Sequence, residues 1–264
     1  FSGDVQIRGT TFIKANTATD NLAIGTDAGA TGQGGRSVAI GLEAGKTSQG
    51  ADTTAIGRSA GLNAQSYGGV AVGLQAGSTE QESSATALGR QAGQTSQGAS
   101  ATAVGYLAAQ NAQGDKSVAV GHRAGLTSQG ANSVAMGDQA GETSQGASAT
   151  AVGFQAGEQA QAVNATAVGI AAGQVTQGAQ SVAIGYSAGM TSQGANSVAI
   201  GGNAGLTSQG VQSVAVGDGA GQVSQDTQSV AIGYLAGSTG QSAQATAVGK
   251  QAGEQAQGVD AVAI

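Results

Sequence analysis

The chain has 264 residues, of which 48 are glycine, none is proline, tryptophan or cysteine, and only 3% are aromatic. This composition provides too little bulk for a conventional globular core, and the absence of cysteine excludes disulfides and thiolate metal sites. The formal net charge of −6 disfavours nucleic acid and anionic membrane surfaces as partners, and no run of about 18 apolar residues suggests a membrane-spanning helix.

Residues 1–20 precede the repeated part of the chain and differ from it in sequence. Within them, residues 4–8 and 11–14 alternate in the manner of β-strands. The terminal units of solenoid proteins commonly differ from the internal ones, because an open end exposes unpaired strand edges. We therefore expect residues 1–20 to form N-terminal cap or connector strands.

Residues 21–264 repeat with a constant 16-residue period, without an insertion or a deletion. The register is marked by a glycine that stands at position 25 and recurs at positions 41, 57 and 73 and onward as far as Gly249. A repeat this regular indicates that each unit stacks on the next, which gives a rod rather than a globule. Collagen is excluded because glycine does not fall at every third position. The sequence predicts an all-β fold, a parallel β-roll or β-solenoid of about 15 coils.

Each register glycine ends a short phrase such as Ser-Val-Ala-Ile-Gly at residues 37–41. The phrase is short, rich in β-branched residues and bounded by glycine, which favours a strand over a helix. Because side chains alternate along a strand, Val38 and Ile40 point to one face, whereas Ser37 and Ala39 point to the other. The first face is aliphatic and the second admits only small residues, so both faces are restricted.

The restriction on both faces predicts contact with a second copy of the chain. A lone solenoid needs only one face inward, yet the alanine at the position of Ala39 never changes, from Ala23 to Ala263. One face would line the interior of the coil, and the other would pack against another chain. We expect a homo-oligomer. The alternative is a monomeric solenoid whose repeats are alike through recent duplication.

A glutamine eight residues after the register glycine is present in every repeat. Stacked about 4.8 Å apart, these side-chain amides would hydrogen-bond one another in a ladder and cap the backbone groups of a turn. The alternative is a row of amides that bind a ligand. The glycines that follow the glutamine, such as Gly50 and Gly98, are expected to supply positive φ angles at corners. The predicted structural ladder includes Gln33, Gln49, Gln129 and Gln193.

The two positions after each register glycine vary widely and therefore mark the outside of the coil. Four of the chain's aromatic residues stand directly after a register glycine. An exposed aromatic residue is often an interaction point, and ordinary tolerance of the surface is the alternative explanation. The candidate exposed contacts at these two positions are Tyr106, His122, Arg123, Phe154, Tyr186 and Tyr234.

The sequence contains no catalytic arrangement. His122 is the only histidine, and without cysteine neither a histidine-assisted nucleophile nor a standard zinc site can form within one chain. Carboxylates such as Asp138, Glu142 and Asp218 are scattered rather than paired, whereas a calcium-binding array would place one aspartate in every repeat. We predict no catalytic, cofactor-binding or metal-binding residues, and a protein that is not an enzyme.

The phrase Ser-Val-Ala-Ile-Gly-x-x-Ala-Gly at residues 37–45, 181–189 and 197–205 resembles the head repeats of trimeric autotransporter adhesins, the YadA-like family. The resemblance implies that each repeat is one coil of a left-handed parallel β-roll and that three chains pack as a homotrimer. The best-known heads of that family use shorter repeats, and the additional residues here fall in the Gly-x-Thr-Ser-Gln-Gly turn. The longer repeat is also similar to surface or fibre repeats of large DNA viruses and phages.

These features predict a rigid repetitive segment of an extracellular fibre, on a bacterial outer surface or a virion surface, that acts in adhesion or host attachment by multivalent display. Its partners would be two further copies of the chain and an unidentified host-surface receptor or matrix, with no nucleic acid and no membrane insertion by this segment. One alternative is a passive structural shaft whose binding tip lies elsewhere. Another is a monomeric ice-binding solenoid, because a threonine column includes Thr31 and Thr47, although Asn63 and Asn111 interrupt it.

Overall fold

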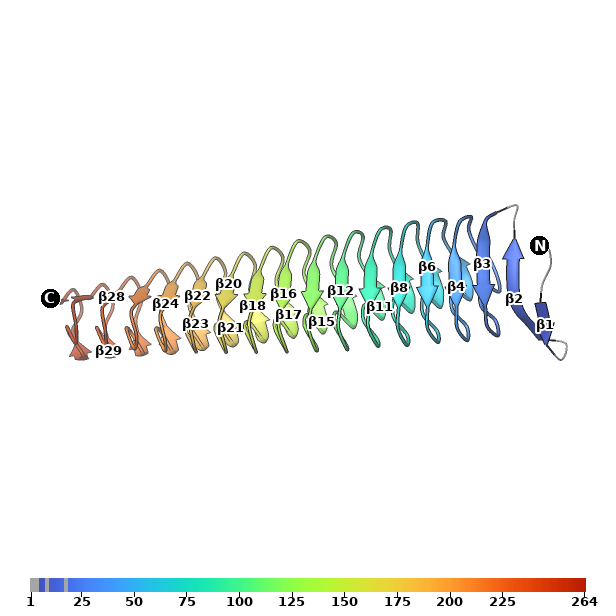
Figure 1. The fold of residues 1–264 in the computed structure, drawn as a ribbon. Helices are drawn as coiled ribbons and strands as arrows, with labels where there is room; N and C mark the ends of the chain where they lie inside the picture. The colour runs from blue at the N-terminus through green and yellow to red at the C-terminus, as the bar shows by residue number, and fades with distance from the viewer. Residues whose placement is uncertain (1–4, 8–9, 17–18) are drawn as a thin grey trace. The chain divides into compact units, whose positions relative to one another are not determined.

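The computed structural model describes residues 5–7, 10–16 and 19–264, and every regular element in this part of the chain is a β-strand (Figure 1). The expected fold class, an all-β parallel β-solenoid with 16-residue coils, is confirmed. The chain divides into two compact units, residues 1–132 and residues 133–264, and each unit is described by itself.

Each coil contributes one strand to each of two sheets. We call them the alanine sheet, formed by the Ser-Val-Ala-Ile phrases, and the glutamine sheet, formed by the Thr-Ser-Gln phrases. In the first unit the alanine sheet contains the parallel strands β3 (Asn21–Ile24), β4 (Val38–Ile40), β6 (Thr54–Ile56), β8 (Val70–Val72), β10 (Thr86–Leu88), β12 (Thr102–Val104) and β14 (Val118–Val120). Its glutamine sheet contains β5 (Thr47–Gln49), β7 (Asn63–Gln65), β9 (Thr79–Gln81), β11 (Thr95–Gln97), β13 (Asn111–Gln113) and β15 (Thr127–Gln129).

The second unit repeats this arrangement. Its alanine sheet contains β16 (Val134–Met136), β18 (Thr150–Val152), β20 (Thr166–Val168), β22 (Val182–Ile184), β24 (Val198–Ile200), β26 (Val214–Val216), β28 (Val230–Ile232), β30 (Thr246–Val248) and β32 (Val262–Ala263). Its glutamine sheet contains β17 (Thr143–Gln145), β19 (Gln159–Gln161), β21 (Val175–Gln177), β23 (Thr191–Gln193), β25 (Thr207–Gln209), β27 (Val223–Gln225), β29 (Thr239–Gln241) and β31 (Gln255–Gln257).

Strand pairing keeps the register of the repeat within each unit. In the first unit Ala87 of β10 pairs with Ala103 of β12. In the second unit Ala183 of β22 pairs with Ala199 of β24. Equivalent residues of successive coils therefore lie side by side, so that a column of the aligned repeats is also a column on the molecule.

Two antiparallel strands precede the first coil. β1 (Val5–Ile7) pairs with β2 (Thr10–Asn16), and β2 pairs antiparallel with β3. The end of the alanine sheet in the first unit is thus covered by a hairpin rather than left as a parallel edge, which limits unwanted strand addition. Residues 1–4, 8–9 and 17–18 of the expected N-terminal segment lie outside the described residues.

The interior of each unit is filled by the small residues of the repeat. Ala39 in the first unit and Ala183 in the second are fully buried, and so are Ala44, three residues after a register glycine, and Ser37. The Ser37 hydroxyl donates to the carbonyl oxygen of Gly34 at 2.7 Å, which satisfies this polar group inside the coil. A core this narrow has no room for a larger side chain.

The burial of the alanine inside a single coil changes the reason for expecting a second chain. The invariant alanine was expected to require a second chain, but the narrow interior of a single coil accounts for it. The aliphatic face carries Val38 and Ile40 and lies on the outside, where both residues are partly exposed. A single chain therefore explains why the inner face admits only small residues. It does not explain why the outer, aliphatic face is restricted.

Every coil contains left-handed backbone positions, and many of them are not glycine. Glu43, Ser48 and Asp52 have φ angles of 58°, 54° and 58°. The left-handed conformation costs an L-residue about 1 kcal/mol. At these three residues the backbone N–H donates to a carbonyl oxygen of the preceding coil at 2.9 Å, and this bond offsets the cost.

Two glycine columns are required for different reasons. Gly41 has a φ angle of 128°, and a Cβ there would lie 2.6 Å from the carbonyl oxygen of Gly57 on the next coil. The expectation that Gly50 and Gly98 supply positive φ angles is wrong, because neither has one. A Cβ at Gly50 would instead lie 2.8 Å from the carbonyl carbon of Ser66, so glycine permits the close approach of two coils there.

Candidate functional site

The glutamine column forms a hydrogen-bonded ladder inside the first unit. Gln65 Nε2 donates to Gln81 Oε1 at 2.9 Å, and Gln81 Nε2 donates to Gln97 Oε1 at 3.0 Å. The amides from Gln49 to Gln129 also cross the interior to the alanine sheet, as Gln97 Nε2 does when it donates to the carbonyl oxygen of Thr86 at 2.8 Å. The ladder extends from Gln33 to Gln129.

The four glutamines chosen from the sequence all occupy this interior position. Gln33, Gln49 and Gln129 are members of the ladder of the first unit. Gln193, in the second unit, donates to the carbonyl oxygen of Val182 at 2.8 Å. Gln49, Gln129 and Gln193 are at most 3% exposed. Amides that bond one another and the backbone inside the coil are not accessible to a ligand, which opposes the alternative of a ligand-binding row.

The residues that directly follow the register glycines form an exposed column, which we call the ridge. Its four aromatic members keep between 42% and 62% of their surface exposed, and Tyr186 is the most exposed of them. The remaining candidate contacts are the exposed His122, also on the ridge, and the partly exposed Arg123 beside it. The four aromatic members are Tyr106, Phe154, Tyr186 and Tyr234.

Cationic and aromatic side chains stack on one another along the ridge of the first unit. The Arg90 guanidinium carbon lies 5.2 Å from the centre of the Tyr106 ring. The His122 ring stacks on Tyr106 with 5.5 Å between centroids and 16° between planes. Both neighbours of Tyr106 on the ridge are thus in contact with its ring, and such a cation–aromatic contact at an exposed site is worth about 0.5–1 kcal/mol.

The ridge of the second unit shows the same type of contact once. Lys250 Nζ lies 5.9 Å from the centre of the Tyr234 ring, one coil further along the chain. The neighbour of Tyr186 on the following coil is Gly202, which has no side chain to stack. The sequence predicts each of these aromatic residues as a separate exposed contact. The structure shows that the neighbours of each ring in the column determine how much of the ring is covered.

The aliphatic face of the alanine sheet is partly exposed in both units. In the first unit Ile56 and Leu88 are 36% and 46% exposed, and in the second unit Met136 and Ile232 are 43% and 41% exposed. Together with the valine or threonine two residues earlier on each strand, these side chains form a continuous aliphatic band in each unit. Contiguous apolar bands of this kind mark interaction surfaces.

Two surface ion pairs of the first unit join Arg36 to Asp52 on successive coils and Lys46 to Glu43 within one coil. Arg36 Nη2 donates to Asp52 Oδ2 at 2.8 Å, which raises the pKa of Arg36 and lowers the pKa of Asp52. Lys46 Nζ lies 2.8 Å from Glu43 Oε1, and this contact raises the pKa of Lys46. Because all these groups are in contact with solvent, each pair contributes little to stability.

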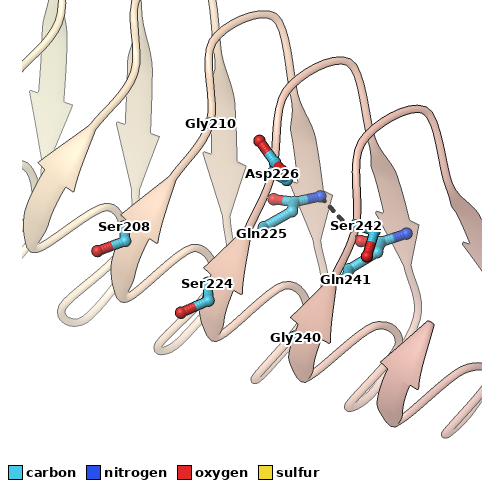
Figure 2. Close-up of a pocket in the computed structure, with 8 residues that line it drawn as sticks. All are labelled: Ser208, Gly210, Ser224, Gln225, Asp226, Gly240, Gln241 and Ser242. Atoms are coloured by element: carbon cyan, nitrogen blue, oxygen red, sulfur yellow. Dashed lines mark hydrogen bonds between the residues drawn. The ribbon is translucent and has the colours of Figure 1, made fainter. Parts of the chain in front are cut away.

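A shallow hollow of about 330 Å³ opens beside the glutamine sheet of the second unit (Figure 2). Gln225 and Gln241 lie at its base, and the exposed Asp226 stands where most coils have glycine. Asp226 Oδ1 accepts a hydrogen bond from the backbone N–H of Thr227 at 2.6 Å. The hollow offers hydroxyl and carboxylate groups and no aromatic side chain. Its full lining is Ser208, Gly210, Ser224, Gln225, Asp226, Gly240, Gln241 and Ser242.

The formal charge is distributed unevenly between the two units. Residues 133–264 contain a single cationic residue, Lys250, so the net charge of −6 falls on this half of the chain. Residues 1–132 contain as many basic as acidic residues. The acidic residues of the second unit are Asp138, Glu142, Glu158, Asp218, Asp226, Glu254 and Asp260.

Two segments of the chain match a known protein family. Residues 96–124 and 177–204 each match the family model of the YadA head domain repeat. Both segments contain the Ser-Val-Ala-Ile type of strand, its register glycine and the buried alanine three residues later. These two segments are similar to YadA head repeats. No curated protein sequence matches the chain.

The YadA head repeat is a structural repeat of adhesins and not an enzyme family. Among the residues that the structure describes, no group of three or more His, Asp or Glu side chains is placed to hold a metal ion. The described part of the chain also contains no helix that is long and apolar enough to cross a membrane. The surfaces that remain as functional candidates in this YadA-like chain are the aliphatic band, the ridge and the hollow of the second unit.

Proposed function

We propose that this chain is a repetitive segment of an extracellular surface fibre, which assembles as a homotrimer and acts in adhesion to a host surface. The observation that carries the proposal is the aliphatic band outside coils that match the YadA head repeat. A monomer would leave this band in contact with water along both units. Three chains that share it would remove it from water, and the gain is about 25 cal/mol for each Å² of apolar surface buried.

The composition of the band also supports burial. On its strands the outward positions hold valine, isoleucine, leucine, methionine and threonine, and none of them holds a charged residue. The charged residues lie elsewhere, for instance Arg58 and Asp218 on the ridge and Lys116 in the turn before β14. A surface that excludes charge while its neighbours carry it has the character of an interface core.

The YadA-type repeats support a location on the bacterial cell surface, and a virion surface is the second candidate. Adhesion would work through multivalent display, because three chains with repeated coils convert weak contacts into avidity. The partner would be a host-surface receptor or matrix component, bound by exposed residues outside the aliphatic band.

Light scattering on a sizing column tests the trimer. One chain has a mass of 24.9 kDa, and a trimer would have three times that mass. We expect the larger mass for the native chain and a smaller one for Val104→Asp, which would place three carboxylates in the proposed interface. Thr95→Asp on the exposed face of the glutamine sheet is the matched control and should keep the native mass. A native mass of 24.9 kDa would refute the trimer.

A separate experiment tests adhesion. Beads coated with the native chain should adhere to host cells, and adhesion should fall when single chains replace trimers on the bead at equal mass. If the trimer forms but coated beads adhere no better than uncoated ones, the segment is a passive shaft whose binding tip lies elsewhere. Thermal hysteresis in a solution of the chain would instead favour the ice-binding alternative.

A further inference from the structure

The ridge of the second unit contains a gap between Tyr186 and Asp218. Residues 186, 202 and 218 lie on successive coils. The backbone N–H of Asn203 donates to the carbonyl oxygen of Tyr186 at 2.8 Å, and the backbone N–H of Gly219 donates to the carbonyl oxygen of Gly202 at 2.8 Å. Gly202 has no side chain, so the ridge is interrupted for one coil. Adjacent coils are about 4.8 Å apart, which places Tyr186 and Asp218 about 10 Å apart along the ridge.

The carboxylate of Asp218 lies over this gap. A Cβ at Gly202 would be 2.8 Å from Asp218 Oδ1, and the next nearest atom is the Asp218 carboxyl carbon at 3.8 Å. Tyr186, at 62% exposure, is more open to solvent than Tyr106 or Tyr234. The gap is therefore bounded on one side by the exposed ring of Tyr186. On the other side it is bounded by the carboxylate of Asp218, which lies two coils further along the chain.

The same ridge shows what such a gap accommodates. Where Tyr106 and Tyr234 have a basic residue on an adjacent coil, the cation lies over the ring, at 5.2 Å for Arg90 and at 5.9 Å for Lys250. Tyr186 has no basic neighbour on the ridge, since Ile170 and Gly202 flank it. A cation from another molecule that entered the gap would lie over the Tyr186 ring, as Lys250 lies over the Tyr234 ring.

We propose that the gap at Gly202 is a binding slot for an arginine side chain of a basic partner protein. The planar guanidinium group would stack on Tyr186 and donate to the Asp218 carboxylate, a combination that a flat cation with several donors makes better than an ammonium group. The excess of acidic residues in the second unit attracts a basic partner over longer range. The inference rests on the proposed function in one respect only: the basic partner is taken to belong to the surface to which the fibre adheres.

The slot is tested by NMR titration of the native chain with Nα-acetyl-arginine amide, with the tyrosine rings isotopically labelled. We expect a saturable shift of the Tyr186 ring signals, in the millimolar range, and little change at Tyr106, whose ring already contacts two neighbours. Nα-acetyl-lysine amide should bind more weakly, and added salt should weaken binding of both. Equal shifts at all tyrosines, or none at Tyr186, would overturn the proposal.

Two variants separate the slot from non-specific attraction. Asp218→Asn should weaken binding of the arginine amide by about fivefold or more, because it removes the counter-charge and keeps the shape. Gly202→Lys should abolish binding by covering Tyr186 from within the chain, and φ at this position is not in the left-handed range. Glu158→Gln, which removes one charge from the same unit outside the slot, is the control and should leave binding nearly unchanged.

If Asp218→Asn and Glu158→Gln weaken binding equally, only general electrostatic attraction operates and the slot is refuted. The titration uses no host cell and does not depend on the adhesion assay. A chain that forms the trimer and adheres but shows no Tyr186 shift would therefore refute the slot and leave the proposed function intact. A chain that binds the arginine amide at Tyr186 but does not adhere would retain the slot and refute adhesion.

Discussion

Replacement of Gln97 by leucine tests whether the glutamine ladder holds the coils together. Leucine has a similar size and keeps the interior filled, so that the substitution mainly removes hydrogen bonds. Gln97 donates to Gln113 Oε1 at 3.0 Å and accepts from Gln81 Nε2 at 3.0 Å. The substitution therefore leaves one acceptor and one donor of the neighbouring amides without their partner in the ladder, and it also removes the bond from Gln97 to the carbonyl oxygen of Thr86.

The magnitude follows from the burial of these two groups. Gln81 is fully buried and Gln113 is 3% exposed, so water cannot replace the lost partner. A buried polar group without its hydrogen bond costs about 1–3 kcal/mol. Gln81 Nε2 keeps its bond to the carbonyl oxygen of Val70 at 2.8 Å, which places its cost at the lower end. We expect Gln97→Leu to destabilise the surrounding coils by about 3 kcal/mol.

Native-state hydrogen exchange measures this loss where it occurs, because solenoid coils depend mainly on their nearest neighbours. Protection of the backbone N–H groups of Gly98 and Thr102 should fall by about 100-fold, since each factor of ten corresponds to about 1.4 kcal/mol. The control is Gln94→Leu, which removes a partly exposed glutamine that accepts from Gln110 Nε2 at 2.8 Å. Equal effects of the two substitutions would show that burial of the ladder contributes nothing.

Three further predictions concern the backbone, the core and one ion pair of the first unit. Ala109 stands where the other coils have glycine and has a φ angle of 47°. Ala109→Gly should therefore stabilise its coil by about 1 kcal/mol, because glycine relieves the left-handed strain. Hydrogen exchange measures this change, and a loss of stability would contradict the prediction. Ala119→Leu should destabilise the fully buried interior by about 3 kcal/mol in chemical denaturation, whereas Val118→Leu on the outer face should change stability by less than about 1 kcal/mol. Because the pair with Arg36 lowers the pKa of Asp52, its contribution is present above the ordinary aspartate value of 3.8 and is lost as the pH falls through the lower folded value. Asp52→Asn should remove this part of the acid dependence of local exchange, and an unchanged profile would show that the pair contributes nothing.

The fold could be predicted from the sequence because the period is regular. A fixed repeat length with short strands that end in glycine permits one type of stacking, and the columns of the aligned repeats are the columns of the molecule. The glutamine column could be placed in the same way, because an amide that never varies beside small residues is the expected sign of a buried ladder. The exposed ridge followed from its variability.

Which strand face is inside could not be read from the alternation alone. Val38 and Ala39 are both restricted, and a sequence pattern does not reveal whether a restriction comes from the interior of one chain or from contact with another. The structure decided it, since the width of the coil admits only the alanine. The left-handed residues such as Ser48 and Asp52 were also invisible in the sequence, because they are not glycine and their cost is offset by hydrogen bonds between coils.

The contacts along the ridge belong wholly to the tertiary structure. Arg90 and Tyr106 are one full repeat apart in the sequence, and nothing in either residue type indicates that they touch until the register of the coils is known. The same is true of Gly202, which resembles any other glycine in the sequence but leaves a gap between Tyr186 and Asp218 on the folded chain. The period by itself determined that equivalent residues stack. The path of the chain within each coil decided which columns face inward, because the direction of a side chain depends on the φ and ψ angles of every residue in the turn.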